Sequence, residues 1–341
     1  MSSDGRADFR PPTLDTVAAA AGVSRATVSR VVNNSAKVSA DVRELVDATI
    51  TRLGYVPNRT ARSLAKRRTD SVALVLREAD ATVLADPYLA AMIIATSRSL
   101  VGTGVQLVLV NARDDPEHGT LVDYVRGGHV DGVLLASMHA DDPLPRVLVE
   151  ARVPTVVGGR PERPVPGLAY VDCDNVGGGR LAAEHLVGTG RRRIASIAGP
   201  PDMTAAADRL TGYHRGLAHA GLPIGPIAFG DFTRLSGERA MTELLERDPD
   251  LDAVFAANDL MAVGALRVLR AAGRRVPEDV AVVGYDDVEL ASLTEPALTS
   301  VHQPVSEQAD TMTGLLLRQI GGAAPGDPVL LPVELVHRDS S

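Results

Sequence analysis

The sequence predicts an all-α helix-turn-helix domain at the N-terminus, followed by a larger α/β core with parallel sheets. Three observations lead to this prediction. Apolar residues recur at helical spacing from Thr13 to about Leu53, strand-like runs alternate with helical stretches after Ser71, and 341 residues exceed one ordinary domain. Alternating strands and crossover helices are typical of parallel sheets, and their number is large enough for two sheets.

Charge separates the same two parts of the chain. Residues 1–68 hold 12 Lys and Arg against 6 Asp and Glu, a net charge of +6. The remainder holds 23 and 37, a net charge of −14, and the whole chain carries −8. A basic end on an acidic body indicates a polyanionic partner that meets only the N-terminal part.

Three short helices are expected in the basic end. Thr13 can cap the first, Ser24 the second and Ser39 the third, with breaks at Gly22 and Gly54. A helix, a tight turn and a second helix form the layout of a helix-turn-helix, whose second helix enters a major groove of DNA. The alternative is a small helical bundle with solvated arginines, which the basic charge makes the weaker interpretation.

Side chains suited to DNA stand along this motif. Arg25 and Arg30 can reach base edges or phosphates, and a guanidinium can pair bidentately with guanine. Short hydroxyl side chains suited to phosphate contacts accompany them, at Thr13, Ser24, Thr27 and Ser29.

The core is expected to alternate between the two kinds of element. The predicted strands are Val72–Leu76, Val105–Val110, Gly132–Leu135, Pro154–Val157, Ile194–Ala198, Ala253–Ala256 and Val280–Val283. The predicted helices between them are Leu89–Leu100, Gly179–Leu186, Leu210–Ala220, Gly237–Leu245 and Leu260–Ala271. Open parallel sheets bind ligands beyond the carboxyl ends of their strands, where polar residues follow several of these runs.

Several function classes find little support in the sequence. Cys173 is the only cysteine, so no intramolecular disulfide can form, and no run of about 18 apolar residues predicts a membrane span. The polar first residues do not resemble a signal peptide, so we expect a cytoplasmic protein. Gly177–Ala182 fits a G-x-G-x-x-A pattern, but the neighbouring Asp172 and Asp174 would repel a pyrophosphate, and a helix-starting turn is favoured. Histidine spacing shows no metal motif, so we expect neither an enzyme nor a cofactor.

An ordered set of motifs closely resembles the lactose repressor family. In the basic end these are Thr13–Ala18, Ala21–Ser24, Thr27–Asn33 and Gly54–Asn58. The resemblance continues in the core through Asp131–Val133, Ala198–Pro200, Ala257–Asp259, Val283–Asp287 and Leu298–Val301. It covers the chain from about Thr13 to Val336.

The resemblance implies a division of the chain into three parts. Residues 1–56 would form the DNA-binding domain, 57–70 a hinge helix and linker, and 71–341 a core similar to periplasmic sugar-binding proteins. In the core, lobe 1 is expected at about 71–168 and 303–327, and lobe 2 at about 169–302 and 328–338. Ligand would lie between the lobes, and two chains would bind a roughly palindromic operator as a homodimer.

The resemblance also implies which residues meet DNA. The second helix of the family reads bases from its first two positions, here Arg25 and Ala26, and its hinge helix matches Asn58–Ala65. Leu64 matches a leucine that enters the minor groove, where an apolar wedge can unstack a base step. The full expected set is Thr13, Ser24, Arg25, Ala26, Thr27, Ser29, Arg30, Asn33, Tyr55, Asn58, Arg59, Ala61 and Leu64.

A small effector, a sugar or a related polar metabolite, is expected in the cleft. Arg209, Asn258 and Asp286 match family ligand positions and offer donors and acceptors for hydroxyl groups, and Phe232 can stack on an apolar face. Weaker matches are Arg113 and Tyr88. The alternatives are a salt-bridge role for Arg209 and turn or capping roles for Asn258 and Asp286.

One position departs from the lactose repressor. That protein has an aspartate after its fourth strand, whereas this chain has Gly159 followed by Arg160, so a galactoside is not the expected ligand. The sequence thus predicts a DNA-binding transcription regulator, in the main a repressor, controlled by a small hydroxylated effector. A corepressor-dependent regulator and a solute-binding protein without a regulatory role remain as alternatives.

Overall fold

The computed structural model describes residues 12–32, 35, 37–55, 68–78, 85–112, 119–140 and 142–341. It divides into two compact units, Met1–Thr69 and Asp70–Ser341. They are called the head and the core below, and each is described by itself. No helix among the described residues is both long and apolar enough to cross a membrane.

The head contains the three expected helices, α1 (Leu14–Ala21), α2 (Arg25–Val32) and α3 (Ala40–Leu53). Thr13 forms a capping box with Thr16, and the Ser24 hydroxyl accepts a hydrogen bond from the Thr27 amide at 3.1 Å. Ser39 precedes α3, but its side chain makes no capping hydrogen bond. Gly22 and Gly54 end α1 and α3 in left-handed conformation, as their positions predicted.

Apolar side chains from all three helices form the core of the head. Val17, Val28 and Val46 are fully buried there, and Tyr55 is 7% exposed beside them. The three-helix arrangement leaves the first turn of α2 on the surface, where Arg25 and Ala26 are exposed.

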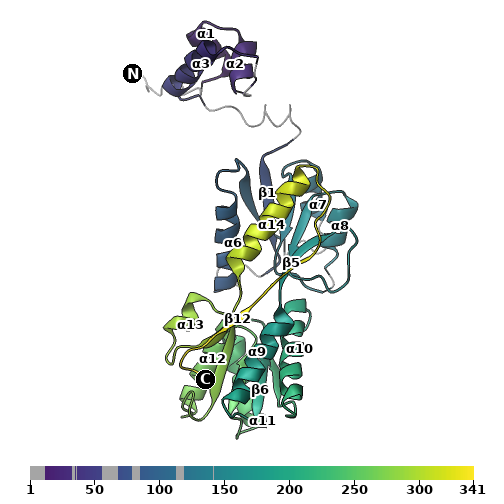
Figure 1. Ribbon diagram of the computed structural model, residues 1–341, viewed down its shortest axis with the longest axis vertical. Helices are drawn as coiled ribbons and strands as arrows, with labels where there is room; N and C mark the ends of the chain where they lie inside the picture. The colour runs from purple at the N-terminus through teal and green to yellow at the C-terminus, as the bar shows by residue number, and fades with distance from the viewer. Residues whose placement is uncertain are drawn as a thin grey trace, which may run out of the picture. The chain divides into compact units, whose positions relative to one another are not determined.

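The core has two lobes, each built on a six-stranded sheet (Figure 1). The sheet of lobe 1 has the order β11-β5-β4-β3-β1-β2 and is parallel throughout. Its strands are β1 (Ser71–Leu76), β2 (Gln106–Asn111), β3 (Gly132–Leu135), β4 (Thr155–Gly158), β5 (Ala169–Cys173) and β11 (Val329–Leu331).

The sheet of lobe 2 has the order β12-β10-β9-β8-β6-β7. Its strands are β6 (Ile194–Ala198), β7 (Ile227–Phe229), β8 (Ala253–Ala256), β9 (Ala281–Asp286), β10 (Thr299–His302) and β12 (Glu334–Val336). The sheet is parallel, as predicted, except at its edge, where β12 pairs with β10 in antiparallel orientation. Two residues connect β11 of lobe 1 to β12, which lies at the edge of the second sheet.

Helices cover both faces of each sheet, so that four apolar clusters fill the core. In lobe 1, α6 (Pro87–Ser99) and α14 (Val305–Ile320) pack on one face, and α7 (Gly119–Arg126) and α8 (Leu144–Glu150) on the other. In lobe 2, α9 (Asn175–Gly188) and α10 (Thr204–His219) face α11 (Arg234–Arg247) and α12 (Asp259–Ala271) across the sheet. A short helix, α13 (Glu289–Leu293), follows β9.

The structure moves two of the expected lobe boundaries. Lobe 1 was expected to end near residue 168, yet β5 pairs with β4 and β11, so lobe 1 continues to Cys173. Likewise β11 belongs to lobe 1, although residues from 328 were assigned to lobe 2. The physical reason is that β5 and β11 complete the first sheet, and the chain changes lobes only after each strand has ended.

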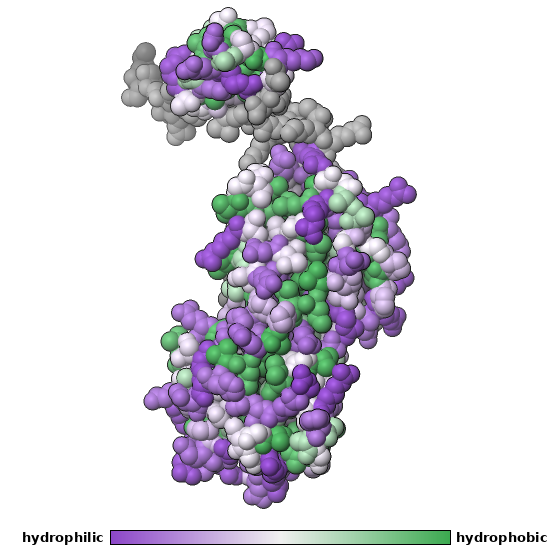
Figure 2. Space-filling model, in the orientation of Figure 1, coloured by the Kyte–Doolittle hydropathy of each residue, from purple (hydrophilic) through white to green (hydrophobic). Residues whose placement is uncertain are grey.

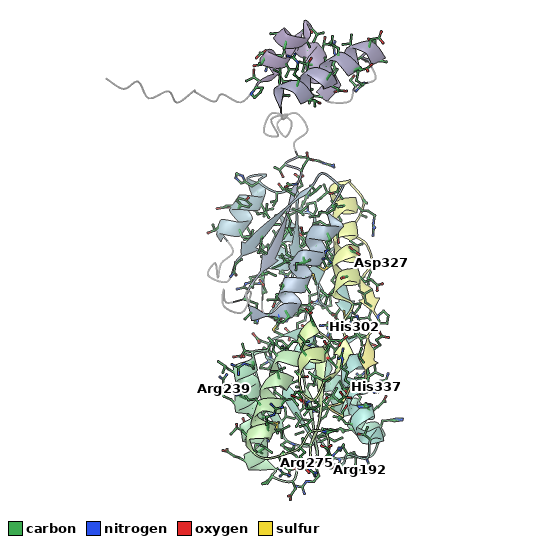
Figure 3. The ribbon with its side chains drawn as sticks, turned by 90° about the vertical axis from the view of Figure 1, so that its left-hand side faces the viewer. Arg192, Arg239, Arg275, His302, Asp327 and His337 are labelled. Atoms are coloured by element: carbon green, nitrogen blue, oxygen red, sulfur yellow. The ribbon has the colours of Figure 1, made fainter. Side chains whose placement is uncertain are left out.

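The surface and the charged side chains follow this two-lobed plan. On the face seen in Figure 2, apolar side chains gather over the middle of the core, and polar ones cover the free end of lobe 2. Arg192, Arg239 and Arg275 lie around the outside of lobe 2, whereas His302 lies at the level where the lobes meet (Figure 3).

Candidate functional site

The first turn of α2 presents the polar surface expected on the head. Arg25, Ala26 and Arg30 are exposed, and the only described charge partner of Arg25 is Asp15, at 3.6 Å between Nε and Oδ1. The Ser24 and Thr27 hydroxyls lie 2.8 Å apart, so the cap fixes both of them at the helix start. The side chains predicted to read bases are therefore exposed at the N-terminal end of the helix, where backbone N–H groups favour negatively charged groups.

Tyr55 requires a correction, and some expected positions lie outside the described residues. The resemblance placed Tyr55 among the DNA contacts, but its ring packs in the core of the head because apolar surface is removed from water there. The positions outside the described residues are Asn33, Asn58, Arg59, Ala61, Leu64 and Arg113.

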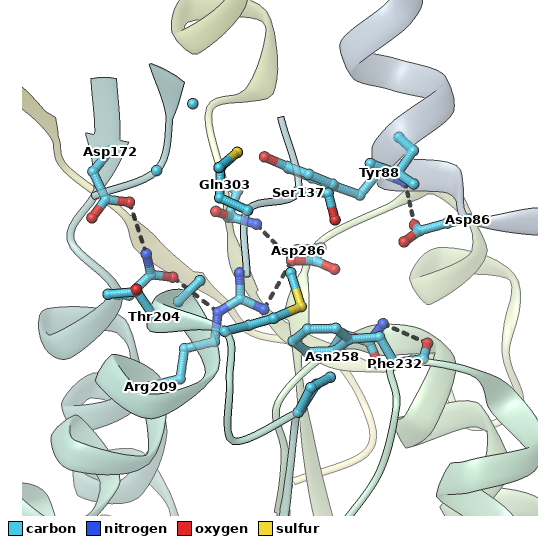
Figure 4. A pocket seen from close by; sticks show the side chains of 18 of the residues that line it. Asp86, Tyr88, Ser137, Asp172, Thr204, Arg209, Phe232, Asn258, Asp286 and Gln303 are labelled. Carbon is cyan, nitrogen blue, oxygen red and sulfur yellow. Dashed lines mark hydrogen bonds and ion pairs between the residues drawn. The ribbon is translucent and has the colours of Figure 1, made fainter. Parts of the chain in front are cut away.

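A cavity between the two lobes collects the residues expected to bind an effector (Figure 4). We call it the inner cavity. Its volume is about 100 Å³. Lobe 1 contributes the ends of β1, β3, β4 and β5, and lobe 2 contributes the ends of β6, β7, β8 and β9. Arg209, Asn258, Asp286, Phe232 and Tyr88 all line it.

Arg209 is the centre of the polar network in this cavity. Its side chain is 6% exposed, and its Nη1 lies 3.3 Å from Asp286 Oδ1. Nε donates to Asn175 Oδ1 at 2.9 Å, and Nη1 donates to the Ala257 carbonyl at 2.6 Å. The guanidinium carbon lies 3.8 Å from the centroid of the Tyr285 ring, within cation–π range. Contacts within the protein thus fix the orientation of Arg209.

Asp286 faces Arg209 from the end of β9. Its backbone has φ of 100°, a conformation that non-glycine residues seldom adopt and that is typical of functional sites. Gln303 Nε2 donates to Asp286 Oδ1 at 2.6 Å. Burial raises the pKa of Asp286 to about 7, although the charge of Arg209 opposes the shift.

Asn258 caps a helix, which was the predicted alternative to ligand binding by this residue. Its Oδ1 accepts a hydrogen bond from the Met261 amide at 2.9 Å and thereby caps α12. Its Nδ2 donates to the Phe232 carbonyl at 2.9 Å, which supports Phe232 at a positive φ of 64°. Asn258 lines the cavity, and its described bonds position Phe232.

Several lining residues escaped the sequence analysis. Asp172 lies near the end of β5 and Asn175 just after it, and Asn175 Nδ2 donates to Asp172 Oδ1 at 3.1 Å. Burial raises the pKa of Asp172 to about 6 and also raises that of Asp86, which caps α6. A signal for Asp86 was present in the sequence, since Asp followed by Pro87 is a typical helix start.

Two ion pairs join the lobes beside the inner cavity. Arg160 of lobe 1 places Nη2 at 2.9 and 2.8 Å from the two carboxylate oxygens of Asp208 on α10. His139 of lobe 1 places Nδ1 2.6 Å from Asp202 Oδ2 of lobe 2, and its Nε2 lies 3.6 Å from Glu78. Hydrogen bonds to Glu78 and Asp202 raise the pKa of His139 to about 9, against the effect of burial, so it is cationic at neutral pH.

The three consecutive glycines of α9, Gly177 to Gly179, allow neighbouring elements to pack closely against this helix. Asp174 Oδ1 accepts a hydrogen bond from the Gly177 amide at 2.8 Å and caps the helix. A Cβ added at Gly178 would collide with the Tyr285 ring, and one at Gly179 with the Arg209 carbonyl. The run thus allows α10 and Tyr285 to approach α9 closely, which agrees with the helix-start interpretation of this motif.

Comparison with known proteins finds one family match in the head and another in the core. Residues 13–58 match a family described as "Bacterial regulatory proteins, lacI family", and residues 183–341 match "Periplasmic binding protein-like domain". The "HTH-type transcriptional regulator CelR" of Thermobifida fusca is 53% identical over 336 residues, which are 97% of this chain and 98% of that protein.

Two solved structures extend the similarity to the fold. One, described as a CelR–cellobiose complex, has a TM-score of 0.77 at 51% identity and covers 97% of this chain and all of that chain. The other is the lac repressor dimer bound to operator and the anti-inducer ONPF. It has a TM-score of 0.87 at 32% identity and covers 97% of this chain and 99% of that one.

Proposed function

The chain belongs to the lacI family of bacterial regulatory proteins, and from this premise we propose that it represses transcription as an operator-bound dimer. A neutral sugar bound between the two lobes would change its affinity for the operator. The proposal involves binding alone, with no enzymatic step, and it places the protein in the cytoplasm with the DNA it regulates.

The observation that carries the effector proposal is the charge balance of the inner cavity. The buried Arg209 is matched by Asp286 at 3.3 Å, and Glu78, Asp86 and Asp172 also line the cavity. An anionic ligand would meet an excess of carboxylates, whereas sugar hydroxyls can donate to them and accept from Arg209. Phe232 adds an aromatic face of the kind on which sugar rings stack.

The sugar we propose is a glucose disaccharide of the cellobiose type. The relative that is 51% identical was solved as a cellobiose complex. In this chain Gly159 stands where the lactose repressor has an aspartate, and a glycine offers no side-chain acceptor at that point. Both observations favour a glucoside over a galactoside.

For the DNA surface, we propose that the first turns of α2 enter the major groove. Arg25 and Ala26 would meet base edges, while Ser24, Thr27 and Ser29 would meet phosphates. Arg30 would reach either. Thr13, at the start of α1, would meet the backbone of the duplex.

The test uses the full-length protein and duplexes that it selects from a random pool, with binding followed by fluorescence anisotropy. We expect a two-fold symmetric consensus and a change in operator affinity of about tenfold or more on adding cellobiose. The direction of that change distinguishes an inducer from a corepressor. Selection of no consensus, or an affinity that no sugar alters, would refute the proposal.

A matched pair of variants locates the DNA surface. Arg25→Ala should remove discrimination between the selected operator and its point variants at one position, at a cost of about tenfold or more. Arg52→Ala removes the same charge from exposed α3 and should leave discrimination intact. Equal loss of discrimination in both variants would contradict the assignment of Arg25 to base reading.

A further inference from the structure

The inner cavity is too small for a whole disaccharide. Its volume of about 100 Å³ holds on the order of eight water-sized groups. That is close to a single sugar ring with part of its hydroxyl groups. A second ring, joined to the first by a glycosidic bond, therefore has to lie beyond the inner cavity.

A second cavity, here called the outer cavity, borders the first and has a volume of about 300 Å³. Met138, Arg160 and Thr204 line both cavities. Met138 and Arg160 follow β3 and β4 of lobe 1, and Thr204 begins α10 of lobe 2. The outer cavity thus continues the cleft at the place where the Arg160–Asp208 ion pair joins the lobes.

The lining of the outer cavity suits a sugar ring. Arg146 and Arg163 are exposed and form no ion pair within the described part of the chain, so their guanidinium donors are available. Glu162 offers an acceptor beside them. Pro143, Pro145 and Pro161 supply apolar ring surface of the kind that packs against the C–H faces of pyranoses.

We propose that the outer cavity is a second sugar subsite, which takes the second ring of a disaccharide whose first ring lies between Arg209 and Phe232. The inference rests on the proposed function, since it names the length of the effector that the same cleft accepts. Arg146 and Arg163 donate hydrogen bonds to hydroxyls of the second ring, and Arg160 lies beside the bond that links the rings. A monosaccharide would use the inner cavity alone.

The experiment compares glucose and cellobiose by isothermal titration calorimetry on the full-length protein. In the double variant Arg146→Ala/Arg163→Ala, the Kd for cellobiose should rise about tenfold while glucose binding stays as in the wild type. The control, Arg126→Ala/Arg152→Ala, removes two exposed arginines of lobe 1 that line neither cavity, and it should bind both sugars normally.

Cellobiose affinity within twofold of the wild type in the Arg146→Ala/Arg163→Ala variant would overturn the second subsite and leave the proposed function standing. Equal losses for glucose and cellobiose would overturn it as well. Inorganic phosphate that binds the wild type but not the variant would show an anion site and refute the inference. If the wild-type protein bound no sugar, the proposed function itself would fail.

Discussion

Replacing Arg209 tests whether the buried ion pair organises the cleft. Arg209→Met keeps much of the side-chain volume but removes the charge, the hydrogen bonds to Asn175 and Ala257, and the attraction on Asp286. Asp286 is 8% exposed and would be left as a buried charge without a counter-ion. Breaking a buried pair from one side costs about 3–5 kcal/mol. At 2–4 °C per kcal/mol, we expect the melting temperature of the core to fall by roughly 6–20 °C.

The second half of this test is a double-mutant cycle. Asp286→Asn alone leaves Arg209 as the unpaired charge and should also destabilise the core. The double variant Arg209→Met/Asp286→Asn carries neither charge, so its loss should be well below the sum of the two single losses. Thermal unfolding at pH 8, followed by circular dichroism, measures all four proteins. Arg215→Met, on the exposed side of α10, serves as the control.

The pH dependence of the same variant has a definite sign. The pKa of Asp286 in the folded protein is raised to about 7, so the folded state binds an extra proton between the unfolded pKa near 4 and pH 7. Stability from this group therefore declines as pH rises through that range and is level above it. Without Arg209 the pKa rises further, so Arg209→Met should keep losing stability above pH 7. A variant that melts within a degree of the wild type at pH 8, or single losses that simply add, would refute the reasoning.

Three further predictions concern packing, pH and DNA. Gly179→Ala should destabilise the core by about 1–3 kcal/mol, because its Cβ meets a backbone carbonyl of α10, whereas Gly188→Ala on the same helix meets open space and should be neutral in thermal unfolding. His139 has a folded pKa of about 9, so its stabilising effect is complete below about pH 6.5 and is lost as pH rises through 9. His139→Gln should remove that part of the melting-temperature profile between pH 7 and 9.5, and an unchanged profile would contradict the ion-pair role. Leu64 lies outside the described residues and stays a sequence prediction: in a gel-shift assay Leu64→Ala should weaken operator binding, while calorimetry should show unchanged sugar binding.

Local signals in the sequence predicted the regular part of the fold. The helix caps at Thr13 and Ser24 and the helix ends at Gly22 and Gly54 were predicted and are present, because capping depends on neighbouring residues only. All seven predicted core strands exist, with small shifts at their ends. Their apolar runs are long enough to be recognised without knowledge of their partners.

The strands that the sequence did not reveal depend on distant partners. β5, β7, β10, β11 and β12 have five residues or fewer, and three of them lie at sheet edges. The sequence of β5, Ala169–Cys173, mixes Tyr170 and Asp172 with apolar residues and shows no strand pattern by itself. It becomes a strand because β4 and β11 pair with it on either side. Because β5 was not predicted as a strand, lobe 1 was expected to end at about residue 168, before this strand begins.

The same distinction applies to the site. Arg209 and Asp286 stand in motifs that the resemblance matched, and the structure brings them together in the cavity. Asp172, Asn175 and Gln303 were missed, since each lies at or just after the end of a strand where the chain leaves one lobe for the other. Whether such a residue faces the cleft depends on the direction of the crossing, which no local pattern encodes.

The residues at the crossings between the lobes explain how ligand binding can change the arrangement of the two lobes. The chain changes lobes after β5, after β10 and after β11. Asn175, just after the first crossing, accepts a hydrogen bond from Arg209 Nε, and Gln303, at the second, donates to Asp286 Oδ1. A ligand that forms hydrogen bonds with Arg209 and Asp286 therefore competes with the hydrogen bonds that Asn175 and Gln303 make at the crossings between the lobes.

A ligand shifts a conformational equilibrium only by the difference between its affinities for the two states. In this cleft the difference has a structural source. Asp86 and Tyr88 come from lobe 1, Arg209 and Asp286 from lobe 2, and all four line one cavity in this lobe arrangement. A sugar that contacts both sets favours that arrangement, whereas one held by lobe 2 alone would bind without changing operator affinity. The effector must therefore contact both lobes at once, and the inner cavity allows this because residues of both lobes line it.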